Sequence, residues 1–408
     1  MTTVRFDMVQ TVAVAVVVLF LGYGVRRQIG VLDRFAIPPP VVGGIIFAGM
    51  ALVLRQAGVV ALQLDTTLQS PVMIACFTAI GLGAGFGLLK TGGAQVMVFG
   101  VLAGLLAVIQ NGVGIGLAAL FGMDPLIGLI TGSITMTGGH GIGAAFGTLM
   151  EDQFQLRGAV TIAMAAATFG LVAGTLVGSP LSTWLIQRRG LVAPASREAA
   201  AARLEGPLPV RAGSVEPAGE PAGAYGMLKT LTLVLVVMLA GGILSRWATG
   251  YGVTLPGYIA SMLAAVLVRN AVDITGAVRI NQRAVDDLGT IALSLFVVMA
   301  MMSLQPWDLP GLELPLVGML AAQVVVTGLF ACLVTFRMLG RDYAAAVMAG
   351  GHCGLGLGAM PVATASMAAI VERLGPAPRA FLVVPVVGVY FNDVTNGIII
   401  ITYLNLVR

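Results

Sequence analysis

Long apolar stretches recur along the whole chain, and most are long enough for one helix across a lipid bilayer, which needs about 20 apolar residues. Only 10% of the residues are charged and 58% are hydrophobic, whereas a soluble domain carries about 25% charged residues. The sequence therefore predicts an all-α polytopic membrane protein and excludes the soluble classes. We expect spans at residues 8–25, 38–54, 71–89, 95–121, 159–186, 228–245, 255–268, 287–304, 315–336 and 380–405.

Two further apolar stretches, 126–150 and 343–370, differ from these spans because glycines cluster in their middle. Glycine is a poor helix former, so we expect each cluster to break its helix. Irregular backbone is tolerated at membrane depth only where protein covers it or where it lines a cavity. We therefore predict a re-entrant hairpin in each stretch. The alternative is that the glycines only let neighbouring helices pack closely.

The basic residues indicate the orientation, because cytoplasmic loops are enriched in Lys and Arg. With both termini on the periplasmic side, all but five of the 22 basic residues fall on the cytoplasmic side. The five are Arg5, Arg55, Arg157, Arg246 and Arg408. Counting either glycine-rich stretch as a full span would spoil this distribution, so the charges support the two hairpins. A net charge of +4 is too small to suggest a nucleic-acid partner.

The chain resembles itself when it is shifted by 218 to 222 positions, so that Asp124 aligns with Asp342 and Phe169 with Phe391. This similarity at a fixed distance indicates an internal repeat.

The repeat divides the chain into an N-terminal half (1–187), a cytoplasmic linker rich in Pro, Ala and charged residues (188–226) and a C-terminal half (227–408). Each half holds five spans and one hairpin, and an odd number of spans places the halves upside down relative to each other. Inverted repeats with broken helices near the midplane are typical of secondary transporters.

The first glycine-rich stretch carries hydroxyl groups beside its expected break, at Ser133, Thr135 and Thr137. Hydroxyls next to freed backbone groups can replace the hydration shell of a small ion or a carboxylate. The alternative is that each hydroxyl bonds to a carbonyl of its own helix. Their place beside the glycine break favours binding.

The two histidines, His140 and His352, each end a Gly-Gly-His sequence in one glycine-rich stretch. Each is either a proton carrier or a neutral imidazole that braces the hairpin, and we favour bracing because a paired residue serves both halves. No set of carboxylates surrounds them, and Cys76, Cys332 and Cys353 show no CxxC spacing. The sequence therefore predicts neither a zinc site nor a disulfide.

Asp393 lies in the middle of the last expected span, where a charge is costly and marks a functional site by default. An ionised Asp393 could bind Na+ or a substrate ammonium group, with Asn392, Thr395 and Asn396 as neutral oxygen donors. The alternative is a structural pair with a histidine. The repeat places Thr168 at the counterpart position in the fifth span, so Thr168 is a further candidate ligand.

Gln110 and Asn111 are polar amides in the middle of the fourth span. Such groups either hydrogen-bond between helices or contact substrate, and the sequence does not distinguish the two.

Five motifs follow one another along the chain: Ile-Pro-Pro-Pro-Val-Val-Gly-Gly (37–44), Gly-Ser-Ile-Thr-Met-Thr-Gly-Gly-His-Gly (132–141), Ala-Thr-Phe-Gly-Leu (167–171), Ala-Gly-Gly-His-Cys-Gly-Leu-Gly-Leu-Gly (349–358) and Phe-Leu-Val-Val-Pro-Val-Val-Gly (381–388). With Asp393 and Asn396 they resemble the sodium:glutamate symporters of bacterial inner membranes. The resemblance covers the chain apart from the linker. It departs at Pro39, where members often have Glu, and at Ile142, where a Thr is common and this chain lacks its hydroxyl.

The resemblance implies sodium-coupled secondary active uptake of L-glutamate across the inner (plasma) membrane, by alternating access with an elevator-like movement in a homodimer. It implies Na+ as the coupling ion, no organic cofactor and no enzymatic activity. The implied substrate-binding candidates are Ser133, Thr135, Thr137, Gly139, His140, Gly351, His352, Cys353, Asn392 and Asn396. The implied sodium-binding candidates are Thr168, Asp393 and Thr395.

The alternative function is Na+- or H+-coupled transport of another small carboxylate. A citrate-type symporter should carry an Arg in a hairpin, and neither glycine-rich stretch contains one. Two rivals come from other classes. An intramembrane hydrolase needs Ser and His within hydrogen-bond reach at a wet site, and an ion channel conducts without saturation.

Overall fold

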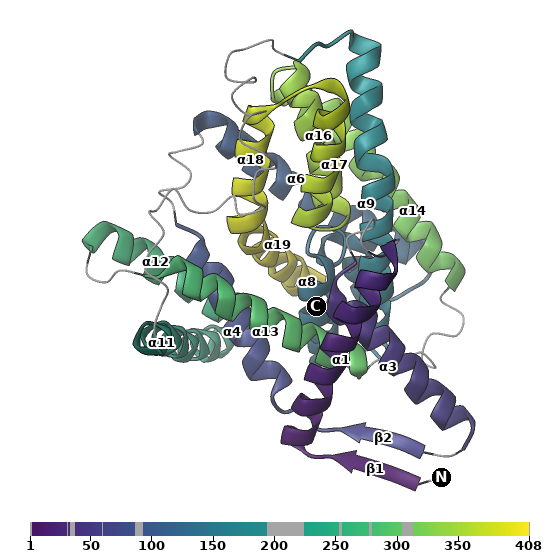
Figure 1. Cartoon of the computed structure of the whole chain (residues 1–408), viewed down its shortest axis with the longest axis vertical. Coiled ribbons are helices and arrows are strands. Elements are labelled where there is room, and N and C mark those ends of the chain that lie inside the picture. The colour runs from purple at the N-terminus through teal and green to yellow at the C-terminus, as the bar shows by residue number, and fades with distance from the viewer. Residues whose placement is uncertain are drawn as a thin grey trace. The chain divides into compact units, whose positions relative to one another are not determined.

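The structure is a computed structural model, and it describes residues 2–30, 32, 37–58, 60–85, 93–193, 224–252, 255–276, 280–303 and 313–407. Most of the expected linker (residues 194–223) lies outside this part of the chain. Within the described residues, eight helices are long and apolar enough to cross a membrane, or nine when one bent pair is counted as a single span (Figure 1). The prediction of a helical polytopic membrane protein is confirmed.

Most of the long helices coincide with expected spans. They are α1 (Met8–Gln28), α3 (Pro39–Gln56), α6 (Gly93–Leu120), α9 (Ala159–Arg189), α11 (Ala224–Gly250), α12 (Gly257–Thr275), α13 (Gln282–Met302) and α14 (Glu313–Phe330), which continues through η3 (Ala331–Thr335) into α15 (Phe336–Met338). Local signals explain several of their ends. Asp7 and Gln10 form a capping box at the start of α1, and the Asn281 side chain caps α13, so that free N–H groups of the first turn gain acceptors.

Two expected spans differ from the structure. The span at 71–89 corresponds to α4 (Gln69–Gly83), a shorter helix, and residues 86–92 are not described. The last span is two helices, α18 (Pro378–Tyr390) and α19 (Asn392–Val407), which are bent by 48° at a break. The expected span at 380–405 is therefore interrupted in the structure.

Two short strands, β1 (Thr2–Phe6) and β2 (Val60–Leu64), form a parallel pair that the sequence analysis did not predict. Arg5 donates a 3.0 Å hydrogen bond from Nε to Gln63 Oε1 across the pair. The strands join the start of α1 to the segment after α3, so two segments far apart in sequence pair at the ends of neighbouring helices (Figure 1).

The first glycine-rich stretch breaks its helix as expected. A short helix α7 (Pro125–Leu129) leads into one wide helical turn, η1 (Ile130–Ile134), and α8 (Gly139–Phe154) follows after four residues. Gly132 has a non-helical backbone (φ −84°, ψ −140°). Gly139 has φ +60°, a left-handed conformation that glycine adopts without strain.

The second glycine-rich stretch behaves differently. The helix α16 (Tyr343–Leu357) runs without interruption through Gly350, Gly351 and His352, and the break comes later, at Gly358 and Ala359, before α17 (Met360–Leu374). The glycine cluster of this stretch therefore breaks the helix only at its last member, Gly358, and not at Gly350 or Gly351.

Close helix packing explains the glycines of α16. Along α9, Gly170, Gly174, Gly178 and Ser182 recur every four residues and so lie on one face of that helix. In the same order they meet Leu357, Gly354, Gly350 and Ala346 of α16. The Ser182 hydroxyl donates a 2.7 Å hydrogen bond to the Ala346 carbonyl. The two helices thus run antiparallel with their backbones nearly in contact, as small residues allow.

On a second face of α16, Gly354 lies against Ala363 and Gly351 against Met367, both on α17. The residue numbers rise on one helix as they fall on the other, so α16 and α17 run antiparallel. Close helix packing is therefore one role of the glycines in this stretch.

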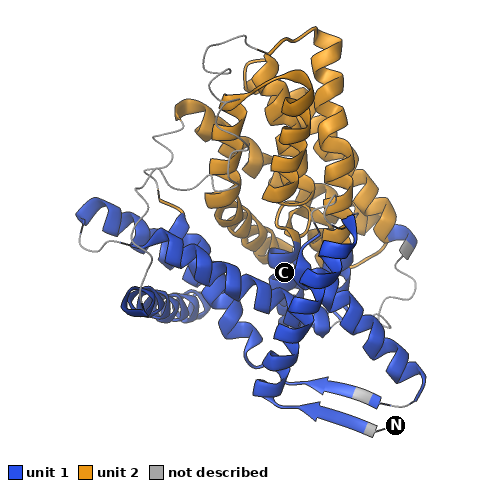
Figure 2. Ribbon diagram, viewed as in Figure 1, with its two compact units in different colours: residues 1–83, 140–165, 222–315 blue, residues 84–139, 166–221, 316–408 orange. Residues whose placement is uncertain are grey.

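The chain divides into two compact units, each of which draws on both halves of the sequence (Figure 2). Unit 1 consists of Met1–Gly83, His140–Ala165 and Ala222–Pro315, and unit 2 of Ala84–Gly139, Ala166–Pro221 and Leu316–Arg408.

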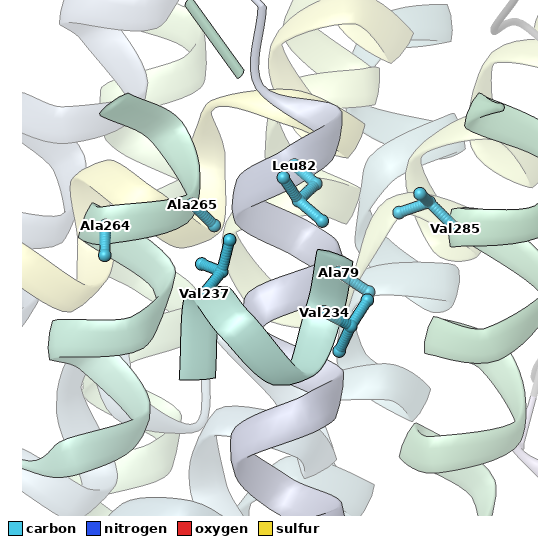
Figure 3. Close-up of a cluster of buried hydrophobic side chains, with 7 residues drawn as sticks. All are labelled: Ala79, Leu82, Val234, Val237, Ala264, Ala265 and Val285. Carbon is cyan, nitrogen blue, oxygen red and sulfur yellow. The ribbon is translucent and has the colours of Figure 1, made fainter. Parts of the chain in front are cut away.

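Small aliphatic side chains form one core cluster of unit 1 (Figure 3). Its fully buried members include Leu82 of α4, Ala265 of α12 and Val285 of α13. A second cluster joins α1, α3 and α13 through Ala15, Val18, Phe47, Val298, Met299 and Met302. Unit 1 is thus a helical bundle with an apolar interior, to which β1 and β2 add one short strand pair.

The contact between α9 and α16 can be tested with Gly350→Ala. A Cβ atom at Gly350 would lie 2.1 Å from Ser182 Oγ and 2.7 Å from the Gly178 carbonyl oxygen, so the helices must separate. We expect the free energy of unfolding to fall by about 1–3 kcal/mol, the usual cost of overpacking. The melting temperature of the purified protein in detergent measures this. Gly116→Ala in α6 is the matched control, because no side chain or neighbouring element among the described residues lies within 4 Å of its Cβ position. Equal melting temperatures for the two variants would contradict the described contact.

Candidate functional site

Three helix interruptions fall within the described residues of unit 2, and two of them lie next to each other. The position of a Cβ atom on Gly139, at the first break, is 2.8 Å from the carbonyl oxygen of Gly358, at the second break. Gly170 of α9 faces the Leu357 carbonyl and the Met136 side chain at the same place. The third interruption, between α18 and α19, is joined to the first break by Asn392 and Asn396. Four segments that are distant in sequence therefore converge within one unit.

At the first break, two amide side chains bond to the backbone groups of Ser133. The Ser133 N–H donates a 2.8 Å hydrogen bond to Asn111 Oδ1 of α6, and the Ser133 carbonyl accepts a 3.0 Å bond from Asn396 Nδ2 of α19. Unpaired backbone groups are costly in a buried apolar environment. Asn111 thus gives the Ser133 N–H an acceptor, and Asn396 adds a second donor to the Ser133 carbonyl, which also accepts a 2.9 Å bond from the Gly138 N–H.

Gln110, the neighbour of Asn111, connects the first break to the second. Its Oε1 accepts a 2.7 Å hydrogen bond from Thr137 Oγ1, and its Nε2 donates to the Gly356 carbonyl at 2.6 Å and to Thr327 Oγ1 at 3.1 Å. The Gln110 carbonyl also accepts from Gln323 Nε2 at 2.8 Å. All of these residues lie in unit 2, and the Gln110 side chain is buried. For Gln110, the structure therefore shows hydrogen bonding between helices.

The three candidate hydroxyls of the first break have different surroundings. Thr135 donates to the Ile130 carbonyl at 2.6 Å, and Thr137 donates to Gln110. Ser133 Oγ has no hydrogen-bond partner among the described residues, although it is buried. The hydroxyls of Thr135 and Thr137 therefore donate hydrogen bonds that stabilise the break, and of the three only the Ser133 hydroxyl has no partner among the described residues.

Three unengaged polar atoms surround the first break. They are Asn111 Nδ2, Ser133 Oγ and Asn396 Oδ1, all without partners in the described part of the chain. Their residues are 0–1% exposed. Buried polar groups are normally hydrogen-bonded, and exceptions often mark a functional site. This cluster, which we call the Ser133 cluster, is the candidate functional site.

Asp393 occupies the first turn of α19, directly after the break at Phe391. A carboxylate is favoured there because the N-terminus of a helix carries partial positive charge. Asn392 Nδ2 lies 3.3 Å from Asp393 Oδ1 and 3.5 Å from the Thr137 carbonyl. The break in the last span thus places Asp393 at a helix end beside the Ser133 cluster, where the sequence had suggested the middle of a helix. Thr395 lies on the outside of α19, and its methyl group faces Gly104 of α6.

His352 lies apart from the Ser133 cluster. Its Nδ1 is 2.7 Å from Thr335 Oγ1, and its ring packs against Phe99 and Phe330 with centroid distances of 4.9 and 5.8 Å. Thr335 ends the wide helical turn η3 of α14. Within the described residues the ring is held by α6, α14 and its own helix, which matches the bracing interpretation and leaves Asp393 without His352 as a partner.

The remaining candidates are distributed as follows. Gly351 faces Met367 and Val384, Cys353 is fully buried in α16, and Thr168 precedes the close contact of Gly170 with Leu357 by two residues. Gly139 lies at the contact of the two breaks. His140 belongs to unit 1, so it is not part of the site described in unit 2.

The sequence analysis did not select Gln323, Thr327 or Thr335, all of which are fully buried. A polar side chain inside an apolar span is itself a signal of a structural or functional role, and Gln323 could have been identified from this signal. Thr327 and Thr335 carry no such signal, because threonine often bonds to its own helix in membranes.

Comparisons with known proteins give one consistent result. The family model described as Sodium/glutamate symporter matches residues 4–376. The sodium/glutamate symporter of Escherichia coli (strain K12) is 39% identical over 98% of both chains, and that of Haemophilus influenzae is 38% identical over 96% of both. Among solved structures, the sodium proton antiporter MjNhaP1 from Methanocaldococcus jannaschii covers 98% of both chains at 13% identity and a TM-score of 0.40, a similarity that supports no further argument. By its sequence, over nearly its whole length, this chain belongs to the sodium/glutamate symporter family.

Proposed function

We propose that this chain carries L-glutamate into the cell together with Na+, by sodium-coupled secondary active transport. Its family is one of transporters and not of enzymes. The observation that carries the proposal is the Ser133 cluster, in which unengaged polar groups lie at helix breaks inside a membrane protein. Broken helices that present polar groups in this way are where secondary transporters bind their cargo.

The substrate brings two carboxylates, and none of the described residues at the three breaks is Lys or Arg. Hydroxyls, amides and backbone N–H groups must therefore meet them, with Na+ supplying positive charge. We assign substrate contacts to Ser133, Asn392 and Asn396 at the first and third breaks, and to the Gly139 backbone where the two glycine-rich stretches meet. Thr135, Thr137, Gly351, His352 and Cys353 support the geometry in this scheme, and His140 remains a candidate from unit 1.

Na+ prefers oxygen ligands, as hard cations do, and we assign Asp393 as its charged ligand with Thr168 and Thr395 as neutral donors. Coupling then has a physical cause. Moving an uncompensated charge through the membrane is costly, so glutamate and Na+ cross together because each offsets the charge of the other.

We further propose alternating access by an elevator-like movement in a homodimer, built on two inverted repeats. The two compact units support this scheme, since each combines parts of both sequence halves. The antiparallel pairing of α16 and α17 supports a re-entrant hairpin in the second half. The proposed location is the bacterial inner membrane, with periplasmic termini and a cytoplasmic linker.

The first experiment is uptake of radiolabelled L-glutamate into proteoliposomes under an inward Na+ gradient. We expect uptake that saturates with glutamate and disappears when K+ replaces Na+. Uptake driven only by a pH gradient, or uptake of another carboxylate in preference to glutamate, would favour the alternative of a different coupling ion or substrate. Conductance without saturation would indicate a channel.

A second experiment addresses Asp393. We expect Asp393→Asn to abolish Na+-driven uptake, because the amide removes the negative charge that offsets the cation while nearly preserving shape. Uptake by the variant is compared with wild type across a series of Na+ concentrations. Asp152→Asn, at an exposed position of α8, is the control and should retain uptake. Unchanged Na+ dependence in Asp393→Asn would refute the assigned role.

A third experiment addresses the link between the breaks. Gln110→Leu leaves Thr137, Thr327 and the Gly356 carbonyl without their partner. We expect the free energy of unfolding to fall by about 3 kcal/mol or more, because three buried groups lose their partner and each costs about 1–3 kcal/mol. The melting temperature in detergent measures the loss, and Gln187→Leu at an exposed position of α9 is the control. A Gln110→Leu protein as stable as this control would show that the link is unimportant.

A further inference from the structure

The orientation of both amides in the Ser133 cluster is determined by the backbone of one residue. Asn111 must turn Oδ1 toward the Ser133 N–H, and Asn396 must turn Nδ2 toward the Ser133 carbonyl. The opposite end of each amide is therefore known. Asn111 presents an unengaged donor, Nδ2, and Asn396 presents an unengaged acceptor, Oδ1.

Both amides bond to the backbone of Ser133, and the hydroxyl of the same residue has no partner among the described residues. The cluster thus offers one donor, one acceptor and one group that can act as either. Its complement is a ligand that brings an anionic acceptor and a cationic donor close together. The carboxylate and ammonium groups on the α-carbon of an amino acid have this property.

Two other ligands fit less well. The N–H groups of Asn111 Nδ2 would repel a bare cation such as Na+. A lone carboxylate, such as the γ-carboxylate of glutamate, would find a donor in Asn111 but would place its oxygens against another acceptor, Asn396 Oδ1. Neither of these leaves all three groups satisfied.

Negative charge nearby strengthens the case for an ammonium group. Asp393 precedes Asn396 by three residues on α19, and residues three apart are neighbours on a helix surface. Asn396, which offers the acceptor, is therefore a neighbour of the Asp393 carboxylate on the surface of α19.

We infer that Asn111, Ser133 and Asn396 form the subsite for the α-carbon end of the amino-acid substrate. Asn111 Nδ2 and the Ser133 hydroxyl donate to the α-carboxylate, and Asn396 Oδ1 accepts from the α-ammonium group. This assignment rests on the proposed function and adds to it the orientation of the substrate and a direct contact for Asn111. The three residues are 0–1% exposed, so the α-carboxylate and α-ammonium groups enter only when the helix ends at the break separate.

The test is Asn111→Asp, which keeps the oxygen that accepts from the Ser133 N–H and replaces the donor by a negatively charged acceptor. Ligand binding to purified wild-type and variant protein in Na+ is measured by ligand-induced thermal stabilisation. The ligands are L-glutamate, its α-amide (L-isoglutamine) and its γ-amide (L-glutamine).

We expect Asn111→Asp to raise the half-saturating concentration of L-glutamate by about tenfold or more, the usual cost of losing a hydrogen bond to a charged group. The α-amide can donate to the new carboxylate, so the preference for L-glutamate over L-isoglutamine should fall by about tenfold. The preference for L-glutamate over L-glutamine should stay unchanged, because both carry the α-carboxylate. An unchanged ratio of L-glutamate to L-isoglutamine would overturn the inference.

A second pair of variants keeps the test valid if Asn111→Asp does not fold. Ser133→Ala removes the unengaged hydroxyl, whereas Thr131→Val removes a hydroxyl whose partners among the described residues are two carbonyls of its own segment, Ile127 and Gly128. We expect weaker L-glutamate binding in Ser133→Ala alone, with an unchanged half-saturating Na+ concentration. Equal binding by the two variants would overturn the inference. Wild-type protein that does not bind L-glutamate in Na+ would overturn the proposed function and the inference together, whereas wild-type binding with unshifted ratios would overturn the inference alone.

Discussion

Backbone N–H and C=O groups need hydrogen-bond partners inside a membrane protein, and the architecture of unit 2 depends on how that need is met where helices break. A continuous helix satisfies its own backbone. At Gly132 and Gly358 the helices stop, and amide side chains from other elements form hydrogen bonds to backbone groups next to these breaks. Asn111 and Asn396 hold the first break, while Gln110 joins the first break to the last turn of α16. These long-range bonds make four distant segments one structure.

The same bonds explain how a stable protein keeps polar groups available for cargo. Each Asn bonds to the backbone with one end of its amide. The break is stabilised, while a donor on Asn111 and an acceptor on Asn396 keep no partner among the described residues. By contrast, the side-chain amide of Gln110 has partners at both its oxygen and its nitrogen. Two adjacent amides on α6 therefore have different roles, one of them structural and one with a group left for a ligand.

Small residues supply the second constraint. The face of α9 from Gly170 to Ser182 brings α9 and α16 so close that a single added methyl group would overlap the partner. In lipid, helices associate through such contacts because apolar side chains gain little by leaving an apolar solvent. The packed helices α9, α16 and α17 form the support against which the break at Gly358 is positioned next to Gly139.

The membrane class, most spans, the family and the break at Gly132–Gly139 could be predicted from the sequence, because apolar length, glycine clusters and motifs are local properties of the chain. The tertiary structure decided the rest. Gly350 and Gly351 have the same local signal as Gly138 and Gly139, yet α16 continues through them because its neighbours fill the space that missing side chains leave. The break before Asp393 and the distinct roles of Gln110 and Asn111 likewise depend on partners more than 20 residues away, which no local pattern reveals.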